Sequence, residues 1–179
     1  MRTANTLSVL LVMSAILTSS IFAQSNASAT STIKAQLKKG LSISNLNGNL
    51  DFGEIVVTAS AQNPNIANAS GVEFEVVGHP AKNITITFAG INLTNNAWVT
   101  ANGGTNSTIA FTPSVESTGG SITYASPASV SSGNVIPLVA TSPVSGLGKL
   151  YLWLGGSLAI ASGQAQGDYT GTFTMTVAY

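Results

Sequence analysis

The sequence predicts an all-β fold, because several separate stretches alternate apolar and polar residues with a period of two. The clearest is the C-terminal stretch, in which threonines alternate with residues that share the other face: Tyr169, Gly171, Phe173, Met175, Val177 and Tyr179. A second alternation starts at Ile33 and continues through Ala35, Leu37, Leu41 and Ile43, with Lys39 in one apolar position. After residue 23, no stretch repeats its apolar residues every 3.6 positions, so the pattern favours strands over helices.

Further strands are predicted, in chain order, over residues 50–57, 72–76, 84–88, 109–111 and 150–154. Weaker strand signals at 122–124 and 135–139 lie within residues 117–145, a Ser-, Gly- and Pro-rich stretch that we expect to be a long loop. The strands at 72–76 and 84–88 are close enough in sequence to form a hairpin. About eight to ten short strands separated by turns predict an antiparallel β-sandwich, with a closed β-barrel as the alternative.

One predicted strand is apolar on both faces. Leu150, Leu152 and Leu154 share one face, while Tyr151 and Trp153 share the other. A strand that buries both faces lies deep in a sheet or under another layer. We therefore expect this strand at the centre of the fold, and we expect the glycine pair at 155 and 156 to turn the chain after it.

The chain is predicted to be exported. Arg2, the apolar run from Leu7 to Leu17 and the small residue Ala23 are typical of a signal peptide over residues 1–23 that is cleaved before Gln24. Residues 24–32 are small and polar and predict a flexible leader, and residues 33–179 predict a single β-sandwich domain. Since no later stretch is long and apolar enough to span a bilayer, we expect no membrane span in the mature chain, which we place in the periplasm, at the cell surface or outside the cell.

The composition excludes some functions. Lys and Arg number six, Asp and Glu also number six, and charged residues make up 7% of the chain. Nucleic-acid binding requires a strongly basic surface, so we expect no nucleic-acid partner. With no cysteine, the fold depends on packing and strand hydrogen bonds. Low charge is also typical of chains that associate through strand edges.

Catalysis is not predicted. His79 is the only histidine, and metal sites require several ligands at set spacings, so no metal or cofactor is expected. Glu73 and Glu75 are two residues apart on one strand, about 7 Å from each other, a spacing that glycosidases use. We favour the simpler interpretation that these two glutamates form the solvent face of a half-buried strand.

Trp98 is a candidate ligand-stacking residue. It stands beside Asn95 and Asn96 in a short run that ends at the turn Asn102-Gly103-Gly104. An aromatic ring next to amide side chains is suited to stacking on a sugar. If Trp98 is exposed, the chain could bind glycans as a monomer.

Three motifs in order resemble DUF4402, a family of secreted bacterial domains of unknown function. They are residues 50–55 (LDFGEI), residues 155–158 (GGSL) after an apolar strand, and the alternating ending from Gly167 to Tyr179. The resemblance covers about residues 33–179, essentially the whole mature chain. The family has no established activity, so the resemblance implies no catalytic residue.

The ending is also similar to that of chaperone–usher pilins, including the spore-coat-U-like branch. This resemblance implies an immunoglobulin-like fold that lacks one strand, which an N-terminal extension of the neighbouring subunit supplies. Ile33, Ala35 and Leu37 would then be the inserted residues. The chain departs from many pilins in having no cysteine pair, and its alternating leader runs almost directly into the domain. Residues 33–43 could therefore also be the domain's own first strand.

We hypothesise that the chain is a structural or adhesive surface protein, a pilus- or filament-type subunit that assembles by β-strand addition. Its partners would be identical subunits or other surface proteins, bound through the edges at residues 33–43 and 169–179. The alternative is a monomeric carbohydrate- or surface-binding module that uses Trp98.

Overall fold

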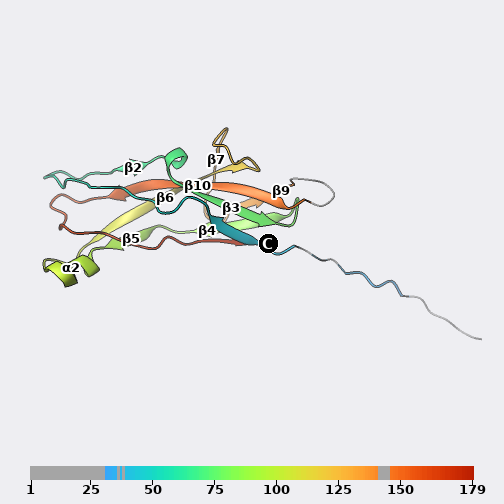
Figure 1. Cartoon of the computed structure of the whole chain (residues 1–179), viewed down its shortest axis with the longest axis horizontal. Coiled ribbons are helices and arrows are strands. Elements are labelled where there is room, and N and C mark those ends of the chain that lie inside the picture. The colour runs from blue at the N-terminus through green and yellow to red at the C-terminus, as the bar shows by residue number, and fades with distance from the viewer. Residues whose placement is uncertain (1–30, 36, 38, 141–145) are drawn as a thin grey trace, which may run out of the picture. The chain divides into compact units, whose positions relative to one another are not determined.

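The structure is a computed structural model that describes residues 31–35, 37, 39–140 and 146–179. The predicted signal peptide and residues 24–30 of the predicted leader lie outside the described residues. The chain divides into two units, Met1–Gln36 and Leu37–Tyr179. In the first unit, the described residues 31–35 have no regular secondary structure. All the elements given below belong to the second unit (Figure 1).

The second unit is built from strands, with one short α-helix and one 3-10 turn among the described residues. In chain order the elements are β1 (Ser42–Asn45), β2 (Asn65–Ile66), η1 (Asn68–Ser70), β3 (Val72–Gly78), β4 (Asn83–Phe88), β5 (Ile91–Thr94), α2 (Asn96–Asn102), β6 (Thr108–Gly119), β7 (Ala128–Ser129), β8 (Val135–Pro137), β9 (Val139–Ala140), β10 (Gly148–Ala159) and β11 (Met175–Ala178).

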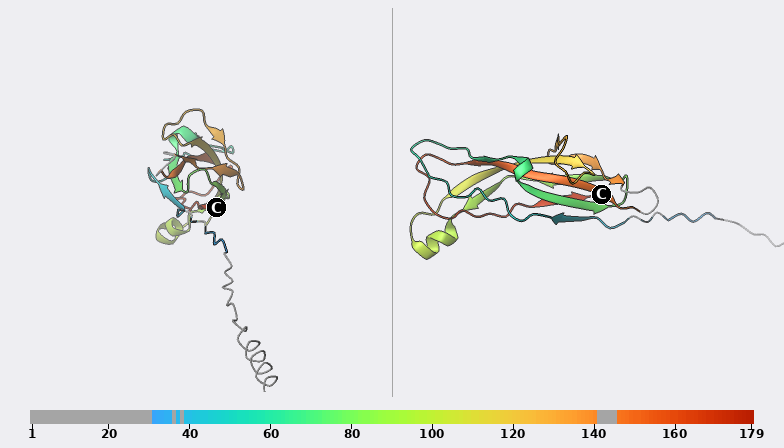
Figure 2. Two further views of the ribbon diagram at one scale, coloured as in Figure 1. Left: turned by 90° about the vertical axis from the view of Figure 1, so that its right-hand side faces the viewer. Right: turned by 45° about the horizontal axis from the view of Figure 1, so that its top comes forward.

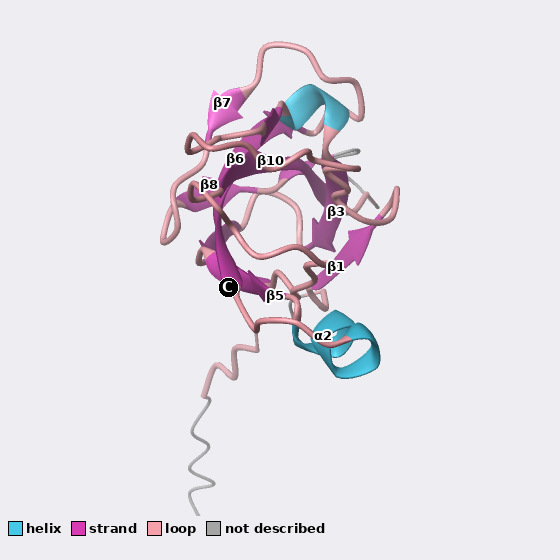
Figure 3. Ribbon diagram, turned by 90° about the vertical axis from the view of Figure 1, so that its left-hand side faces the viewer, coloured by secondary structure: helices cyan, strands magenta, loops and turns pink. Residues whose placement is uncertain are grey.

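The strands form two antiparallel sheets that enclose the apolar core. The larger sheet has the order β1-β3-β10-β6-β5, with β2 and β9 also paired to β10 and β7 paired to β6. The smaller sheet has the order β11-β4-β8. Seen end-on, the two sheets surround the interior and α2 lies outside it (Figure 3). Because the strands form two separate sheets, the predicted all-β sandwich is confirmed.

Strand β10 occupies the centre of the larger sheet, as its two apolar faces predict. It pairs with β3 along Gly148–Leu154 and with β6 along Tyr151–Ala159 (Figure 2). Leu150, Leu152 and Leu154 point into the core between the sheets, while Tyr151 and Trp153 are buried on the opposite face. Burial on both faces explains why no polar residue interrupts this strand between Leu150 and Leu154.

The predicted turn at Gly155-Gly156 is wrong, because β10 continues through both glycines to Ala159. These glycines instead allow the backbone of η1 and the Phe111 ring to approach β10 closely. A Cβ atom at Gly155 would lie 2.8 Å from the backbone nitrogen of Asn68 in η1, and one at Gly156 would lie 2.7 Å from the Phe111 ring. Only a residue without a side chain lets the neighbouring backbone approach so closely.

The predicted hairpin between residues 72–76 and 84–88 is also wrong. Strand β3 lies in the larger sheet and β4 in the smaller one, so the connection crosses the sandwich. Ala81 adopts a φ of 55° in this connection, and its N–H donates to the carbonyl of Leu138. The connection is thus held against the residue between β8 and β9. Its four residues, 79–82, would be short enough for a hairpin, so the crossing to the other sheet and not the loop length rules the hairpin out.

Two further predictions are corrected by the structure. Residues 96–102 form a helix of about two turns, too short to display a 3.6-residue repeat, which ends where Gly103 takes a φ of 77°. The predicted long loop at 117–145 contains the end of β6 and all of β7, β8 and β9, and residues 141–145 lie outside the described residues. The weak strand signal at 135–139 does fall on β8 and β9, whereas residues 122–124 form no strand. Strands β7, β8 and β9 are only two or three residues long, so their alternation gives little signal.

Candidate functional site: an open groove in the sandwich

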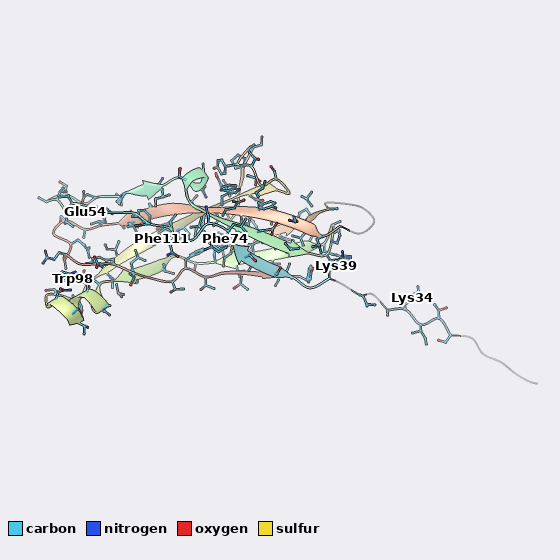
Figure 4. All side chains as sticks on the ribbon, in the orientation of Figure 1. Lys34, Lys39, Glu54, Phe74, Trp98 and Phe111 are labelled. Atoms are coloured by element: carbon cyan, nitrogen blue, oxygen red, sulfur yellow. The ribbon has the colours of Figure 1, made fainter. Side chains whose placement is uncertain are left out.

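An open groove of about 280 Å³ lies over the inner face of the larger sheet. Residues 45–52 line one side and residues 171–173 line the other. The floor is apolar and comes from four strands of the larger sheet: Val72, Phe74, Ile91, Leu93, Phe111 and Leu154. Phe74 and Phe111, both labelled in Figure 4, are the aromatic part of this floor. The groove is therefore a place where the apolar core remains accessible.

The first side of the groove continues into residues 49–58, which the sequence predicts as a strand over 50–57. Leu50, Phe52 and Ile55 do pack against the core, and the Phe52 ring meets that of Phe111 edge-on at 6.1 Å between centroids. The hydrogen bonding of a strand is missing, however, so that prediction is wrong in this respect. No backbone group of residues 49–58 pairs with another backbone group in the described part of the chain. This segment is packed like a strand but has no ladder partner.

The second side of the groove is lined by residues 171–173, which follow directly on Thr170. The Thr170 N–H donates to the Thr94 carbonyl at 3.0 Å, and the Thr170 carbonyl accepts from the Thr94 N–H at 2.9 Å. From Gly171 to Thr174, no backbone pairing exists among the described residues, and the ladder resumes where Met175 pairs with Phe88 of β4. Figure 1 shows this segment and residues 49–58 both running lengthwise along the domain. Two stretches with unpaired backbone thus border one apolar groove, and such edges accept an added strand.

Most of the residues predicted to exchange strands are built into the domain itself. Leu41 and Ile43 pack against the core, and β1 pairs with β3 of the same chain. The C-terminal residues do likewise, since β11 pairs with β4 and the following side chains pack on or within the core: Tyr169, Phe173, Met175 and Val177. Ile33, Ala35 and Leu37 differ, because all three are exposed, Ile33 to 94% and Leu37 to 83%.

Tyr179 packs beside His79 and Lys39, at the end of the domain where the leader joins it. Its hydroxyl accepts a hydrogen bond from the His79 N–H at 2.6 Å and donates one to the Lys39 carbonyl at 2.8 Å. The Lys39 ammonium group donates to the carbonyl of Gly146 at 2.9 Å. These bonds hold Lys39 in place against the ends of β3 and β10. The leader therefore leaves the domain from a position that the C-terminal residue determines.

Trp98, the predicted ligand-stacking residue, is half-buried on α2. A Cβ atom at Gly167 would lie 3.0 Å from its ring, and one at Gly104 would lie 3.6 Å from it. The neighbouring Asn95 is fully buried and donates its amide to the carbonyls of Thr105 and Gln166. Trp98 thus packs over glycine backbone and helps to fix α2 on the 164–170 loop, and it remains partly exposed.

The outer face of the larger sheet carries a second cluster, which the sequence analysis did not predict. Trp153 donates its indole N–H to Thr118 at 3.0 Å, and the Tyr124 ring meets it edge-on at 5.2 Å between centroids. The Tyr124 hydroxyl donates to Glu116. On the same face, Glu75 of β3 accepts hydrogen bonds from Lys149 at 2.5 Å and from Tyr151 at 2.8 Å. These contacts bury the side chains of Trp153 and Tyr151, so packed side chains cover this part of the outer face.

Glu73 and Glu75 share this face but titrate differently. The hydrogen bond from Lys149, followed by that from Tyr151, lowers the pKa of Glu75 below its usual 4.5. Burial raises the pKa of Glu73, and the nearby charge of Glu75 raises it further. One carboxylate oxygen of Glu73 is buried without a hydrogen-bond partner. Glu73 and Glu75 therefore act on stability in opposite directions at neutral pH.

The substitutions Glu73→Gln and Glu75→Gln should shift the thermal unfolding midpoint in opposite directions at pH 7. The stability linked to Glu73 is present below the unfolded-state pKa of 4.5 and is lost as pH rises through the raised folded-state pKa, so its replacement stabilises. The stability linked to Glu75 is present above 4.5 and is lost as pH falls through the lowered folded-state pKa, so its replacement destabilises. Calorimetry at pH 7 and pH 3 should show both differences shrinking at pH 3. Shifts in the same direction at pH 7 would contradict this assignment.

The groove itself was not predicted from the sequence, although a signal for it exists. Residues 50–57 have the composition of a strand, while residues 58–71 contain only the two-residue β2 and so supply no partner of matching length.

Among the described residues, no group of three or more acidic, histidine or cysteine side chains could hold a metal ion. The described part of the chain also contains no helix that is long and apolar enough to cross a membrane.

The two antiparallel sheets define an all-β sandwich domain, the class that the alternating strands predict. Residues 41–179 match the family described as Domain of unknown function (DUF4402), and the chain belongs to this family. The match begins at Leu41, next to the start of β1, and includes both sides of the groove. No curated protein and no solved structure matches the chain.

Proposed function

We propose that this chain is an exported structural or adhesive surface protein, a pilus- or filament-type subunit that assembles by β-strand addition. One observation carries the proposal: residues 49–58 are packed on the core like a strand and yet have no backbone partner among the described residues. Sheet edges with unpaired N–H and carbonyl groups are templates for another strand, and folded domains normally cover or blunt them. Here the first part of the segment, residues 49–52, borders a groove with an apolar floor instead.

The leader supports the donor half of this proposal. Its apolar residues Ile33, Ala35 and Leu37 occur at every second position and are exposed. A strand that is added to an edge gains main-chain hydrogen bonds, and its alternate side chains enter pockets that set the register. The few charges of the chain favour such association, because charged side chains, lysine above all, are what commonly prevents edges from pairing.

The proposal is tested by the oligomeric state of the chain that begins at Gln24. Wild-type protein should form oligomers or filaments in light scattering and negative-stain microscopy. The double substitution Ile33→Asp and Leu37→Asp should weaken association by about 100-fold or more, because burying two carboxylates in an apolar groove costs several kcal/mol. The matched control is Thr32→Asp with Gln36→Asp, which adds the same charge on the opposite face and should still assemble.

Two results would refute strand addition. One is a wild-type chain that stays monomeric at every concentration, which would favour the surface-binding alternative. The other is equal assembly by the Ile33/Leu37 variant and its control, because the leader's apolar face would then have no role.

A further inference from the structure

We infer that the groove is the acceptor site for residues 31–37 of a second copy of this chain. The inference rests on the proposed function and deepens it by assigning both the site and its occupant. The acceptor is bordered by residues 45–52 on one side and residues 171–173 on the other, with the inner face of the larger sheet as its floor.

The groove has the chemistry and size that the leader requires. Its floor is formed by aliphatic and aromatic side chains, including Phe74, Leu93 and Phe111. An apolar cavity of about 150 Å³ is large enough to hold a benzene molecule. The 280 Å³ of the groove can therefore take about two branched aliphatic side chains with a smaller one between them. Ile33, Ala35 and Leu37 form such a series.

The backbone on both sides has no ladder partner, although the Gly53 N–H donates to the Asp51 side chain and the Val56 carbonyl accepts from the Gln62 side chain. Residues 49–58 and 171–174 have no backbone pairing among the described residues. Neighbouring strands of a sheet lie about 4.8 Å apart, so one strand placed between two such edges can bond to both. Gly171 packs against β5, since a Cβ atom there would lie 2.6 Å from Leu93, so this edge is backed by the larger sheet. The inserted strand would connect the two sides of the groove.

The leader of the same chain cannot fill this groove, because Lys39 is held by Tyr179 and Gly146. Ile33 is six residues before Lys39 and so reaches at most about 20 Å from it. A leader that folds back at Lys39 and pairs with the following residues would place Ile33 opposite Asn45. Asn45 is where β1 ends and the groove begins, whereas the groove extends to Phe52. Only a separate chain can place all three apolar residues along its floor.

Charge also favours a second copy. If Ile33 and Leu37 face the groove, Lys34 faces outward. Asp51, between the lining residues Leu50 and Phe52, is exposed at the groove, and Glu54 is exposed two residues beyond Phe52. An ammonium group beside two carboxylates gives complementary charge at the rim, which selects partners and register more than it adds affinity. Either substitution alone, Lys34→Glu or Glu54→Lys, should therefore impair assembly. The two substitutions combined exchange the charges and should restore it.

The assignment is tested by disulfide trapping, for which a chain without native cysteines is suited. Two full-length exported chains with different tags would be mixed, one with Ala35→Cys and the other with Thr172→Cys, a groove-lining position. The matched control partner carries Thr123→Cys, which is exposed on the opposite side of the larger sheet. The groove pair should yield at least about tenfold more cross-linked dimer than the control, since disulfides form only where Cα atoms come within about 7 Å.

The other outcomes separate this inference from the proposed function. If oligomers form but the Ala35→Cys chain is trapped instead by Ser44→Cys on β1 or Val135→Cys on β8, strand addition stands and the groove assignment is wrong. Cross-links that form only within one chain carrying both Ala35→Cys and Thr172→Cys would overturn the second copy as occupant. Absence of any oligomer would overturn both.

Discussion

The substitution Gly71→Ala is expected to destabilise the fold by about 3 kcal/mol or more, the upper part of the range for inserting atoms into a packed interior. Gly71 lies between η1 and β3, where the chain passes directly over β10. A Cβ atom at this position would overlap the carbonyl oxygen of Leu154 and lie 2.9 Å from its carbonyl carbon. The obstacle is the backbone of the central strand, which cannot move without breaking its pairing with β3 and β6.

Denaturant unfolding of Gly71→Ala and Gly40→Ala would test this expectation. Gly40 is the matched control, because its Cβ would meet nothing within 4 Å. Its substitution should change the free energy of unfolding by no more than about 0.5 kcal/mol. Equal stability of the two variants would show that η1 does not pack on β10 as closely as the structure indicates.

The substitution Leu152→Ala is expected to destabilise the fold by about 2–5 kcal/mol. Leu152 is fully buried in the middle of β10, where it lies between Phe74 of β3 and Ser117 of β6. Removing its branched end deletes buried apolar surface and leaves a cavity, because strands on both sides hold the backbone in place. For a domain of this size the loss should lower the unfolding temperature by roughly 5–15 °C.

The matched control for Leu152→Ala is Ile122→Ala, a similar truncation at a side chain that is 60% exposed. It should leave the unfolding temperature nearly unchanged, since surface substitutions rarely exceed about 0.5 kcal/mol. Thermal unfolding followed by circular dichroism would measure both variants. A larger loss for Ile122→Ala than for Leu152→Ala would mean that the apolar centre of the fold lies elsewhere.

Residues with a repeating local pattern were predicted well. The five residues from Leu150 to Leu154 are apolar on both faces, which indicates a strand with neighbours on each side, and β10 has them. The C-terminal alternation predicted the residues that face the core, and Met175 and Val177 do so. Side-chain direction in a strand follows from a period of two alone, so a single sequence contains it.

Features that depend on contacts distant in sequence were not predicted. Residues 50–57 have a strand composition, but whether they find a ladder partner depends on where β3, β5 and residues 170–174 lie. Likewise, the contact of the Trp98 ring with the glycines at 104 and 167 joins segments that no local pattern connects, while ligand stacking by Trp98 stays a prediction. The sequence shows which residues are apolar, but not which surface covers them.

The sequence by itself determined the all-β class, the central position of Leu150–Leu154 and the alternating leader, because each follows from the local order of apolar and polar residues. Only the tertiary structure decided that β3 and β4 lie in different sheets and that β1 and β11 pair within the chain. It also decided that residues 49–52 border an open groove. Strand pairing joins residues far apart in the chain, and backbone hydrogen bonds are nearly the same for every residue type, so side-chain identity alone does not specify the partner.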